Sequence, residues 1–414
     1  MYHRTRWIPA RMWPGVLLLC LLCGSCDDHP SATGVTESDS AGVRILTSHG
    51  AGWASESSWQ LELDLNVGSL DGPNSFARLR DVAPRRAGGF WVLDSQERRV
   101  RAFDESGTEM LAFGRPGQGP GELGFVDHVA ELPDGSIVVG GSGPISLHRF
   151  DADGGHVSST TLPDSVFRPR REATTAAGPP AGPSFGRWRV AKDGAVFVQT
   201  VVVEADEERV VRNDVLFRLA EDGGRAVRLS VWGAAVMDGG PGGELRLLEP
   251  DAAWSPLEGG GAWFTAGSVY ELRRLDPAGQ ATTVVRRPGP RLEVTGSIKR
   301  AVREKLGRRM DSDFERALLD RAVFPEHLPA TLGLWAAESA GELWVGVVDP
   351  SSTWNYERAN AWDIFEVGGA FLGRMAMPAS FRPTRVTGEH VYGIWLDELD
   401  VPHARRYRIL RERE

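Results

Sequence analysis

The chain has 414 residues, of which 41% are hydrophobic and 25% are charged, and its formal net charge is −9. This composition is ordinary for a globular protein, and the acidic balance argues against nucleic acid as a partner because phosphates repel an acidic domain. All the cysteines, Cys20, Cys23 and Cys26, lie near the start, which excludes a disulfide framework, a thiolate metal site and a cysteine nucleophile from the rest of the chain.

Residues 1–25 have the features of an export signal. Arg4, Arg6 and Arg11 precede a short apolar run that ends at Cys23, and no acidic residue interrupts them. A basic start, a short apolar run and small residues at a cleavage site are typical of a secretory signal. The run is shorter than the about 20 residues that span a bilayer. We therefore interpret residues 1–25 as a signal peptide and expect an exported protein.

The segment from Leu22 to Cys26 resembles the lipobox of bacterial lipoproteins, although Cys23 stands where leucine is usual. The resemblance implies that Cys26 is lipidated and anchors the protein in the cell envelope, on its periplasmic or outer face. The alternative is an ordinary signal peptide cut nearby, with Cys26 as an idle thiol. Residues 26–40 are small, polar and acidic, and they predict a flexible tether because they cannot bury apolar area.

From residue 41 to 414 one β unit recurs. Its clearest copy, residues 89–107, has a glycine turn, an apolar strand, a polar turn, a second strand and an Asp-x-x-Gly turn, which indicates antiparallel neighbours. Further copies begin at Asp134, Asp193, Gly261, Gly341 and Glu389, and the last copy is the weakest. Repetition at this spacing predicts an all-β fold, a six-bladed β-propeller. The alternative is a β-sandwich with long loops.

Two early segments could close the ring. Leu61, Leu63, Leu65 and Val67 alternate with polar residues, and residues 43–46 form another short apolar run. A propeller closes when an N-terminal strand pairs with the last blade, which removes exposed sheet edges. We therefore expect an N-terminal strand to complete the sixth blade.

Residues 297–322 interrupt the β pattern. Ile298, Val302, Leu306 and Met310 recur every four residues, which predicts an amphipathic helix with a break near Asp311. We interpret the region of about 295–328 as an insertion between blades 4 and 5 whose apolar row packs on the propeller. Because its first half is basic, attachment to an anionic lipid surface is the alternative.

The strand unit from Asp94 to Gly107 resembles the NHL repeat, as do residues 114–123 ahead of residues 132–138, although NHL repeats usually carry Asn where Glu97 stands. The whole of residues 39–412 is similar to the six-bladed β-propeller lipoproteins of environmental bacteria. The resemblance implies the fold and says little about activity, because that family is largely uncharacterised.

The chain offers few candidate site residues. Its histidines are scattered, so no local metal, cofactor or catalytic motif is visible. Trp354, Tyr356 and Arg358 lie in a polar stretch and are candidates for a partner or ligand surface, with packing beneath a loop as the alternative. Asp94 ends a blade strand and could reach the rim of the channel. Its alternative role is to accept hydrogen bonds from turn amides.

These observations predict a membrane-tethered, extracytoplasmic binding or assembly module for a protein or glycan partner. We expect it to be monomeric and to need no cofactor. The alternative is a metal-dependent hydrolase, similar to the sugar-acid lactonases, with acidic residues and a metal in the central channel. That alternative rests on fold analogy.

Overall fold

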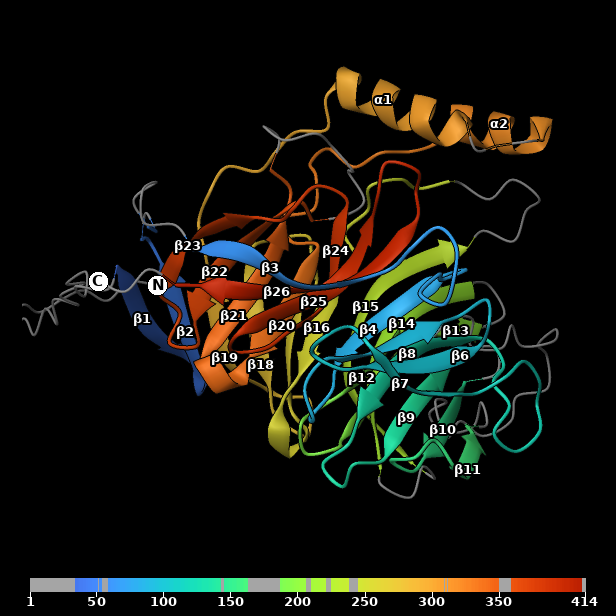
Figure 1. The fold of residues 1–414 in the computed structure, drawn as a ribbon. Coiled ribbons are helices and arrows are strands. Elements are labelled where there is room, and N and C mark those ends of the chain that lie inside the picture. The colour runs from blue at the N-terminus through green and yellow to red at the C-terminus, as the bar shows by residue number, and fades with distance from the viewer. Residues whose placement is uncertain are drawn as a thin grey trace, which may run out of the picture.

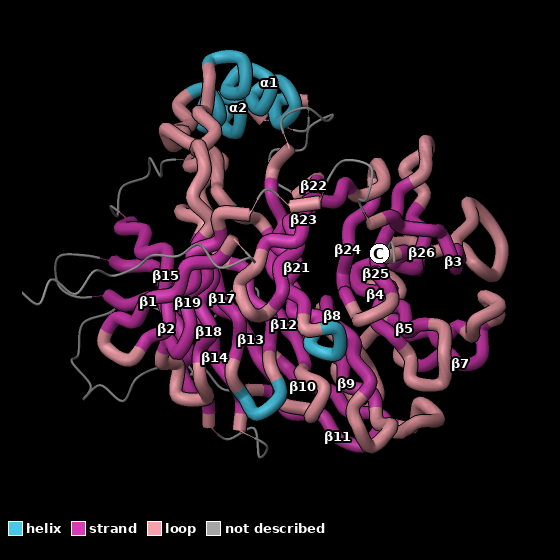
Figure 2. Tube along the Cα trace, turned by 90° about the vertical axis from the view of Figure 1, so that its left-hand side faces the viewer, coloured by secondary structure: helices cyan, strands magenta, loops and turns pink. Residues whose placement is uncertain are grey.

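Six β-sheets surround a common axis in the computed structural model (Figure 1, Figure 2). The first strand of each sheet contacts the first strands of both neighbouring sheets, so these strands form the inner wall of a ring. The structure describes residues 34–411, with gaps at 51, 54–58, 143–144, 163–186, 206–209, 221–224, 238–244, 309, 311 and 350–358. The prediction of an all-β six-bladed propeller is confirmed.

Blades 1 to 3 each contain four consecutive antiparallel strands. They are, in order, β4 (Leu79–Pro84), β5 (Phe90–Asp94), β6 (Arg99–Phe103) and β7 (Glu109–Phe113); β8 (Val126–Glu131), β9 (Ile137–Gly141), β10 (Ser146–Phe150) and β11 (His156–Thr161); and β12 (Arg187–Val190), β13 (Val196–Ala205), β14 (Val210–Leu219) and β15 (Ala226–Met237).

Blades 4 and 6 also recruit strands from the N-terminal part of the chain. The strands of blades 4 to 6 are β16 (Ala253–Pro256), β17 (Ala262–Thr265), β18 (Glu271–Leu275), β19 (Ala281–Arg286), β2 (Val43–Ser48) and β1 (Val35–Ser40); β20 (Gly333–Ala337), β21 (Glu342–Val347), β22 (Ala361–Glu366) and β23 (Phe371–Ala376); and β24 (Phe381–Val386), β25 (His390–Leu396), β26 (Pro402–Leu410) and β3 (Gln60–Val67). Each of the six recurring sequence units supplies the second and third strands of one blade.

The Asp-x-x-Gly turns join the third and fourth strands of blades 1, 2 and 4. In each turn one aspartate oxygen accepts the amides two and four residues ahead, at Asp104, Asp151 and Asp276. The glycine that follows Asp104 has φ +81°, a left-handed conformation that side chains other than glycine rarely adopt. The repeated turn signal therefore corresponds to one repeated backbone geometry.

The ring closes through β3, as expected. β3 pairs antiparallel with β26 and completes blade 6. The other candidate, residues 43–46, does not take part in closure: it belongs to β2, which pairs in parallel with β19 at the outer edge of blade 4. A parallel partner far along the chain leaves no local sequence signal, since no turn connects the two strands.

Closure by β3 can be tested within one strand. Leu65 is 7% exposed in the cluster between blades 6 and 1, whereas Leu63 is 48% exposed. We expect Leu65→Ala to lower the free energy of unfolding by about 2–4 kcal/mol and Leu63→Ala by at most about 0.5 kcal/mol. Urea denaturation measures both. Equal small losses would mean that β3 adds little to ring closure.

The predicted flexible tether of residues 26–40 is wrong for its last part. Residues 35–40 form β1, which pairs antiparallel with β2 along its whole length. Glu37 and Arg44 form an ion pair at 2.6 Å across this hairpin, and Val35 packs against the cluster between blades 4 and 5. Pairing with β2 outweighs the polar composition of this segment, because the backbone hydrogen bonds do not depend on side-chain polarity.

The core lies between blades. Six clusters of buried apolar side chains each join two neighbouring sheets around the ring. One contains Trp263 of blade 4 and Phe365 of blade 5, both of which are almost fully buried. Burial in every blade junction makes the ring stable without disulfides.

The helical insertion lies on one face of the propeller (Figure 1) and contains α1 (Gly296–Gly307) and α2 (Asp313–Asp320). The chain leaves helical geometry between them, which confirms the expected break. Val302 is buried in a cluster with Val294, Leu328 and Val348. Val302, in the middle of the apolar row, therefore packs against loop residues, of which Val348 directly follows β21 of blade 5. Among the described residues no helix is long and apolar enough to cross a bilayer.

Candidate functional site

Asp94 is the one predicted site residue that the structure describes. It ends β5, is fully buried, and accepts hydrogen bonds from the amides of Ala77, Arg78, Gln96 and Glu97 at 2.7–3.2 Å. The structure thus places Asp94 in the turn-stabilising role and away from any exposed surface. The sequence correctly placed Asp94 at the end of a strand. Its carboxylate, however, binds backbone amides of two loops and does not face the channel rim.

The remaining predicted site residues lie outside the described part of the chain. These are the lipidation candidate and the three surface candidates: Cys26, Trp354, Tyr356 and Arg358.

The structural role of Asp94 predicts a large effect of substitution. Asp94→Ala would leave four backbone N–H groups without their acceptor, which we expect to cost about 2–3 kcal/mol of unfolding free energy. Asp104→Ala is the matched control because it removes the same kind of turn contact where water can replace it. Thermal denaturation should show a much larger drop in Tm for Asp94→Ala. Similar drops would contradict this role.

The first strands of the blades bring together a set of polar and aromatic side chains at the propeller axis. Each blade contributes one side chain, and none of them was predicted as a site residue: Asp81, His128, Arg189, Ser255, Trp335 and Arg385. A weak sequence signal exists, because Asp81, His128 and Arg189 are each followed by Val-Ala at the end of a first strand, and Arg385 is followed by Val-Thr. We call this set the axial ring.

Arg385 joins blades 6, 1 and 2. Its Nη1 and Nη2 donate to Oδ1 and Oδ2 of Asp81 at 3.1 and 2.8 Å. Nη2 also lies 2.9 Å from Nδ1 of His128 and donates to the carbonyl oxygen of Val129 at 3.1 Å. The amides of Val82 and Val129 donate to the same carboxylate. A bidentate guanidinium and two amides therefore saturate Asp81.

The contact with Arg385 shifts the pKa values of both Asp81 and His128. Burial alone would raise the pKa of Asp81, but the Arg385 guanidinium and the His128 hydrogen bond outweigh burial and lower it to about 2. Burial and the charge of Arg385 lower the pKa of His128 to about 4, although Asp81 opposes this. At neutral pH the contact between blades 6, 1 and 2 therefore holds a carboxylate, a guanidinium and a neutral imidazole.

Arg189 joins blades 3, 4 and 5. Its Nη1 donates to the carbonyl oxygens of Trp254 and Leu334, the latter at 2.9 Å. Its guanidinium carbon lies 3.6 Å from the centroid of the Trp335 ring, within cation–π distance. Burial and the charge of Arg385 lower the pKa of Arg189 well below its usual range. None of the ion pairs among the described residues involves Arg189, and the nearby charge of Asp81 opposes the lowering of its pKa only in part.

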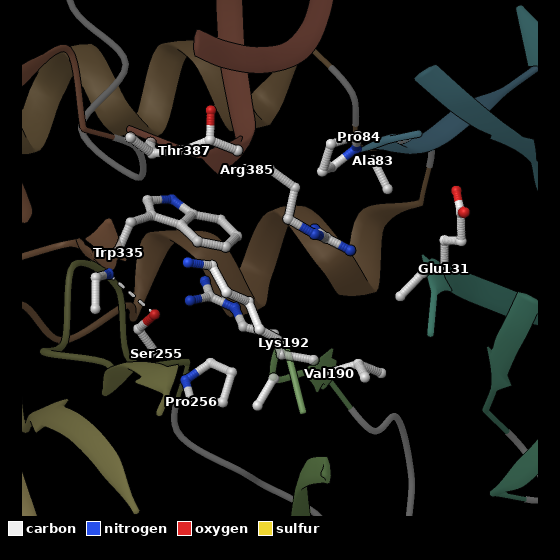
Figure 3. Close-up of a pocket in the computed structure, with 15 residues that line it drawn as sticks. Ala83, Pro84, Glu131, Val190, Lys192, Ser255, Pro256, Trp335, Arg385 and Thr387 are labelled. Carbon is white, nitrogen blue, oxygen red and sulfur yellow. Dashed lines mark hydrogen bonds between the residues drawn. The ribbon is translucent and has the colours of Figure 1, made fainter. Parts of the chain in front are cut away.

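A cavity of about 190 Å³ lies at the C-terminal ends of the first strands (Figure 3). Four members of the axial ring line it. All six blades contribute to its wall. Its lining residues are Ala83, Pro84, Ala130, Glu131, Arg189, Val190, Ala191, Lys192, Ser255, Pro256, Trp335, Ala336, Arg385, Val386 and Thr387. We call this cavity the axial pocket.

The hydroxyl groups of the axial pocket are not arranged as nucleophiles. Ser255 Oγ accepts the amide of Ala336 at 3.0 Å, and Thr387 Oγ1 exchanges hydrogen bonds with the backbone of His390. Within the described part of the chain neither hydroxyl contacts a histidine ring or a carboxylate, which a hydroxyl nucleophile needs for activation. The described residues also contain no group of three or more His, Cys, Asp or Glu side chains that could hold a metal ion.

No family model matches the chain, and no curated protein matches it. Among solved structures, a member of the DUF4221 family from Bacteroides vulgatus has a TM-score of 0.52 at 10% identity, with 86% of this chain and 100% of that chain covered. Virginiamycin B lyase from Staphylococcus aureus has a TM-score of 0.41 at 12% identity, with 85% and 99% covered. The calcium-binding protein regucalcin from Agrobacterium tumefaciens has a TM-score of 0.40 at 11% identity, with 82% and 93% covered. At 10% identity the likeness to the DUF4221 structure shows the fold alone.

Proposed function

We propose that the protein is an extracytoplasmic binding module, tethered to the bacterial envelope through lipid on Cys26, that holds a protein or glycan partner without chemical turnover. The observation that carries the proposal is the double contact of Arg385 with Asp81. Through this contact Asp81 and His128 bind Arg385 and connect blades 6, 1 and 2. Arg189 connects blades 3, 4 and 5 through hydrogen bonds to two backbone carbonyl groups. A ring fixed in this way is a rigid frame for the loops on its two faces.

The same contact argues against a metal-dependent hydrolase. Such a centre would need the Asp81 oxygens as ligands, but a guanidinium lies within 3.1 Å of both of them. A metal ion bound to these oxygens would have to displace the Arg385 guanidinium. If Arg385 stayed in place, two cations would be buried side by side.

The tether can be tested by metabolic labelling with an alkyne-bearing fatty acid. We expect the wild-type protein to carry the label and to fractionate with membranes, and Cys26→Ser to lose both properties. Cys23→Ser is the matched control and should keep the label. Label that persists in Cys26→Ser would overturn the proposed anchor.

Partner binding can be tested with the surface candidates Trp354 and Tyr356. We expect crosslinking in intact cells, or co-sedimentation with cell-wall glycan, to recover a partner that the Trp354→Ala/Tyr356→Ala variant loses. Leu399→Ala is the control, because Leu399 is a large apolar side chain that is 73% exposed. Recovery of nothing beyond what an unrelated lipoprotein recovers would contradict a partner-binding role.

A further inference from the structure

The axial pocket has an excess of positive charge. Arg189, Lys192 and Arg385 line it, but only Arg385 has an acidic partner among the described residues. The one acidic residue of the lining, Glu131, already accepts hydrogen bonds from Trp91 Nε1 at 2.8 Å and from a backbone amide at 3.0 Å. With Arg385 paired to Asp81, the two cations Arg189 and Lys192 face one carboxylate, Glu131, and the pocket keeps a net positive charge for a ligand.

Arg189 is fixed by its contacts but keeps N–H donors that form no hydrogen bond within the described chain. Its hydrogen bonds within the described chain use Nη1 alone, and Trp335 covers one side of the guanidinium. A guanidinium has five N–H donors in a fixed fork, so Nε and Nη2 remain for an acceptor in the pocket. Lys192 also lines the pocket, and in Figure 3 its side chain points toward Trp335. The lowered pKa of Arg189 is consistent with a buried cation that forms no ion pair among the described residues.

Small apolar residues form a large part of the remaining wall. Ala83, Pro84, Ala130, Val190 and Pro256 lie around the cavity. Its volume of about 190 Å³ is well above the roughly 10–15 Å³ that one water molecule needs, so the pocket has room for a small organic molecule. A hydrated inorganic anion would leave these walls uncovered, whereas an apolar body would cover them.

We propose that the axial pocket binds a small organic carboxylate, with its anionic group at Arg189 and Lys192 and its apolar or aromatic body against the small side chains of the wall. This inference goes beyond the partner-binding role and does not depend on it. If it fails, crosslinking of a macromolecular partner can still succeed, and the reverse also holds.

Titration calorimetry with benzoate as the probe tests the ligand class, using the Cys26→Ser protein purified without its lipid. We expect benzoate to bind, and benzamide and inorganic sulfate to bind at least about tenfold more weakly, which corresponds to one lost charge-assisted contact. Benzamide that binds as tightly as benzoate would overturn the role of the charge. Sulfate that binds as tightly would overturn the organic class, and no binding of benzoate would overturn the proposal.

Two variants locate the site. Lys192→Gln changes an exposed side chain without an ion pair among the described residues, and we expect it to weaken benzoate binding by about tenfold. Lys299→Gln in α1 is the control and should bind like the parent. Arg189→Gln should abolish binding, but it also removes contacts between blades, so its folding must be checked by circular dichroism. Unchanged affinity in Lys192→Gln would contradict the site.

Amine labelling provides a readout that needs no substitution, because the chain has only the lysines Lys192, Lys299 and Lys305. We expect benzoate to protect Lys192 from acetylation, as followed by mass spectrometry of its peptide. Lys299 and Lys305 lie in α1 and serve as internal controls. Equal protection at all three lysines, or none at Lys192, would contradict the proposed site.

Discussion

Arg385→Met should be among the most destabilising single substitutions in this protein. It removes the cation from Asp81, which is 3% exposed, and leaves a buried carboxylate without its partner. Breaking a buried ion pair on one side costs about 3–5 kcal/mol. The free energy of unfolding, measured by urea denaturation, should fall by this amount, and blades 6, 1 and 2 should lose their common contact.

Arg408→Met is the matched control for this prediction. Arg408 pairs with Glu62 at 2.7 Å on neighbouring strands, but both side chains are about half exposed. Such a surface pair contributes about 0–1 kcal/mol. In addition, Asp81→Asn/Arg385→Met should be less destabilised than the sum of its single variants, because the second change removes the orphaned charge. If Arg385→Met and Arg408→Met were equally stable, the axial ring would have no structural role.

Stability between pH 4 and 6 should depend on two neighbouring residues with opposite effects. His128 has its pKa lowered to about 4 by burial and by Arg385, so the unfolded chain binds more protons and stability rises with pH up to about 6.5. Burial raises the pKa of Asp127 to about 6 despite its hydrogen bond with Ser142. The folded chain then binds more protons, and stability falls as the pH rises from about 4 to 6.

In the wild type the contributions of these two residues largely cancel in this range. Asp127→Asn should expose the contribution of His128, a rise of up to about 3 kcal/mol between pH 4 and 6.5. His128→Gln should show the opposite slope. Below pH 4 the contribution of Asp81, whose pKa is about 2, should also be lost. Urea denaturation at pH 4, 5, 6 and 7 measures the profiles, and parallel profiles for all three proteins would contradict the assigned shifts.

The fold could be predicted because each blade repeats a local signal. The second and third strands are joined by short polar turns, and their apolar alternation and Asp-x-x-Gly turns depend only on neighbouring residues. The closing strand β3 was also predictable, since Leu61 to Val67 alternate over its whole length. The helical insertion followed from the four-residue recurrence of Ile298, Val302 and Leu306.

The axial ring could not be predicted in the same way. Its members come from six separate strands, and Asp81 and Arg385 are 304 residues apart in sequence. Most of them lie in short strands that mix apolar and polar residues, such as β4 (LRDVAP), β8 (VDHVAE) and β24 (FRPTRV), so little in the sequence sets the axial residue apart from its polar neighbours. The position of β2 escaped prediction for a related reason, because its partner β19 is distant in sequence. Asp94 illustrates the opposite case: its strand end was recognised, but only the fold shows that backbone amides surround the carboxylate.

In this account the propeller axis serves binding and is not a metal-dependent catalytic centre, and an activity measurement tests this directly. Hydrolysis of sugar-acid lactones should be measured for the purified wild-type protein and for Asp81→Asn, with and without added Ca²⁺ or Zn²⁺. Because Arg385 saturates Asp81, we predict a rate equal to that of the buffer blank under every condition. Metal-dependent hydrolysis by the wild type that Asp81→Asn abolishes would contradict the account and establish the propeller axis as a catalytic centre.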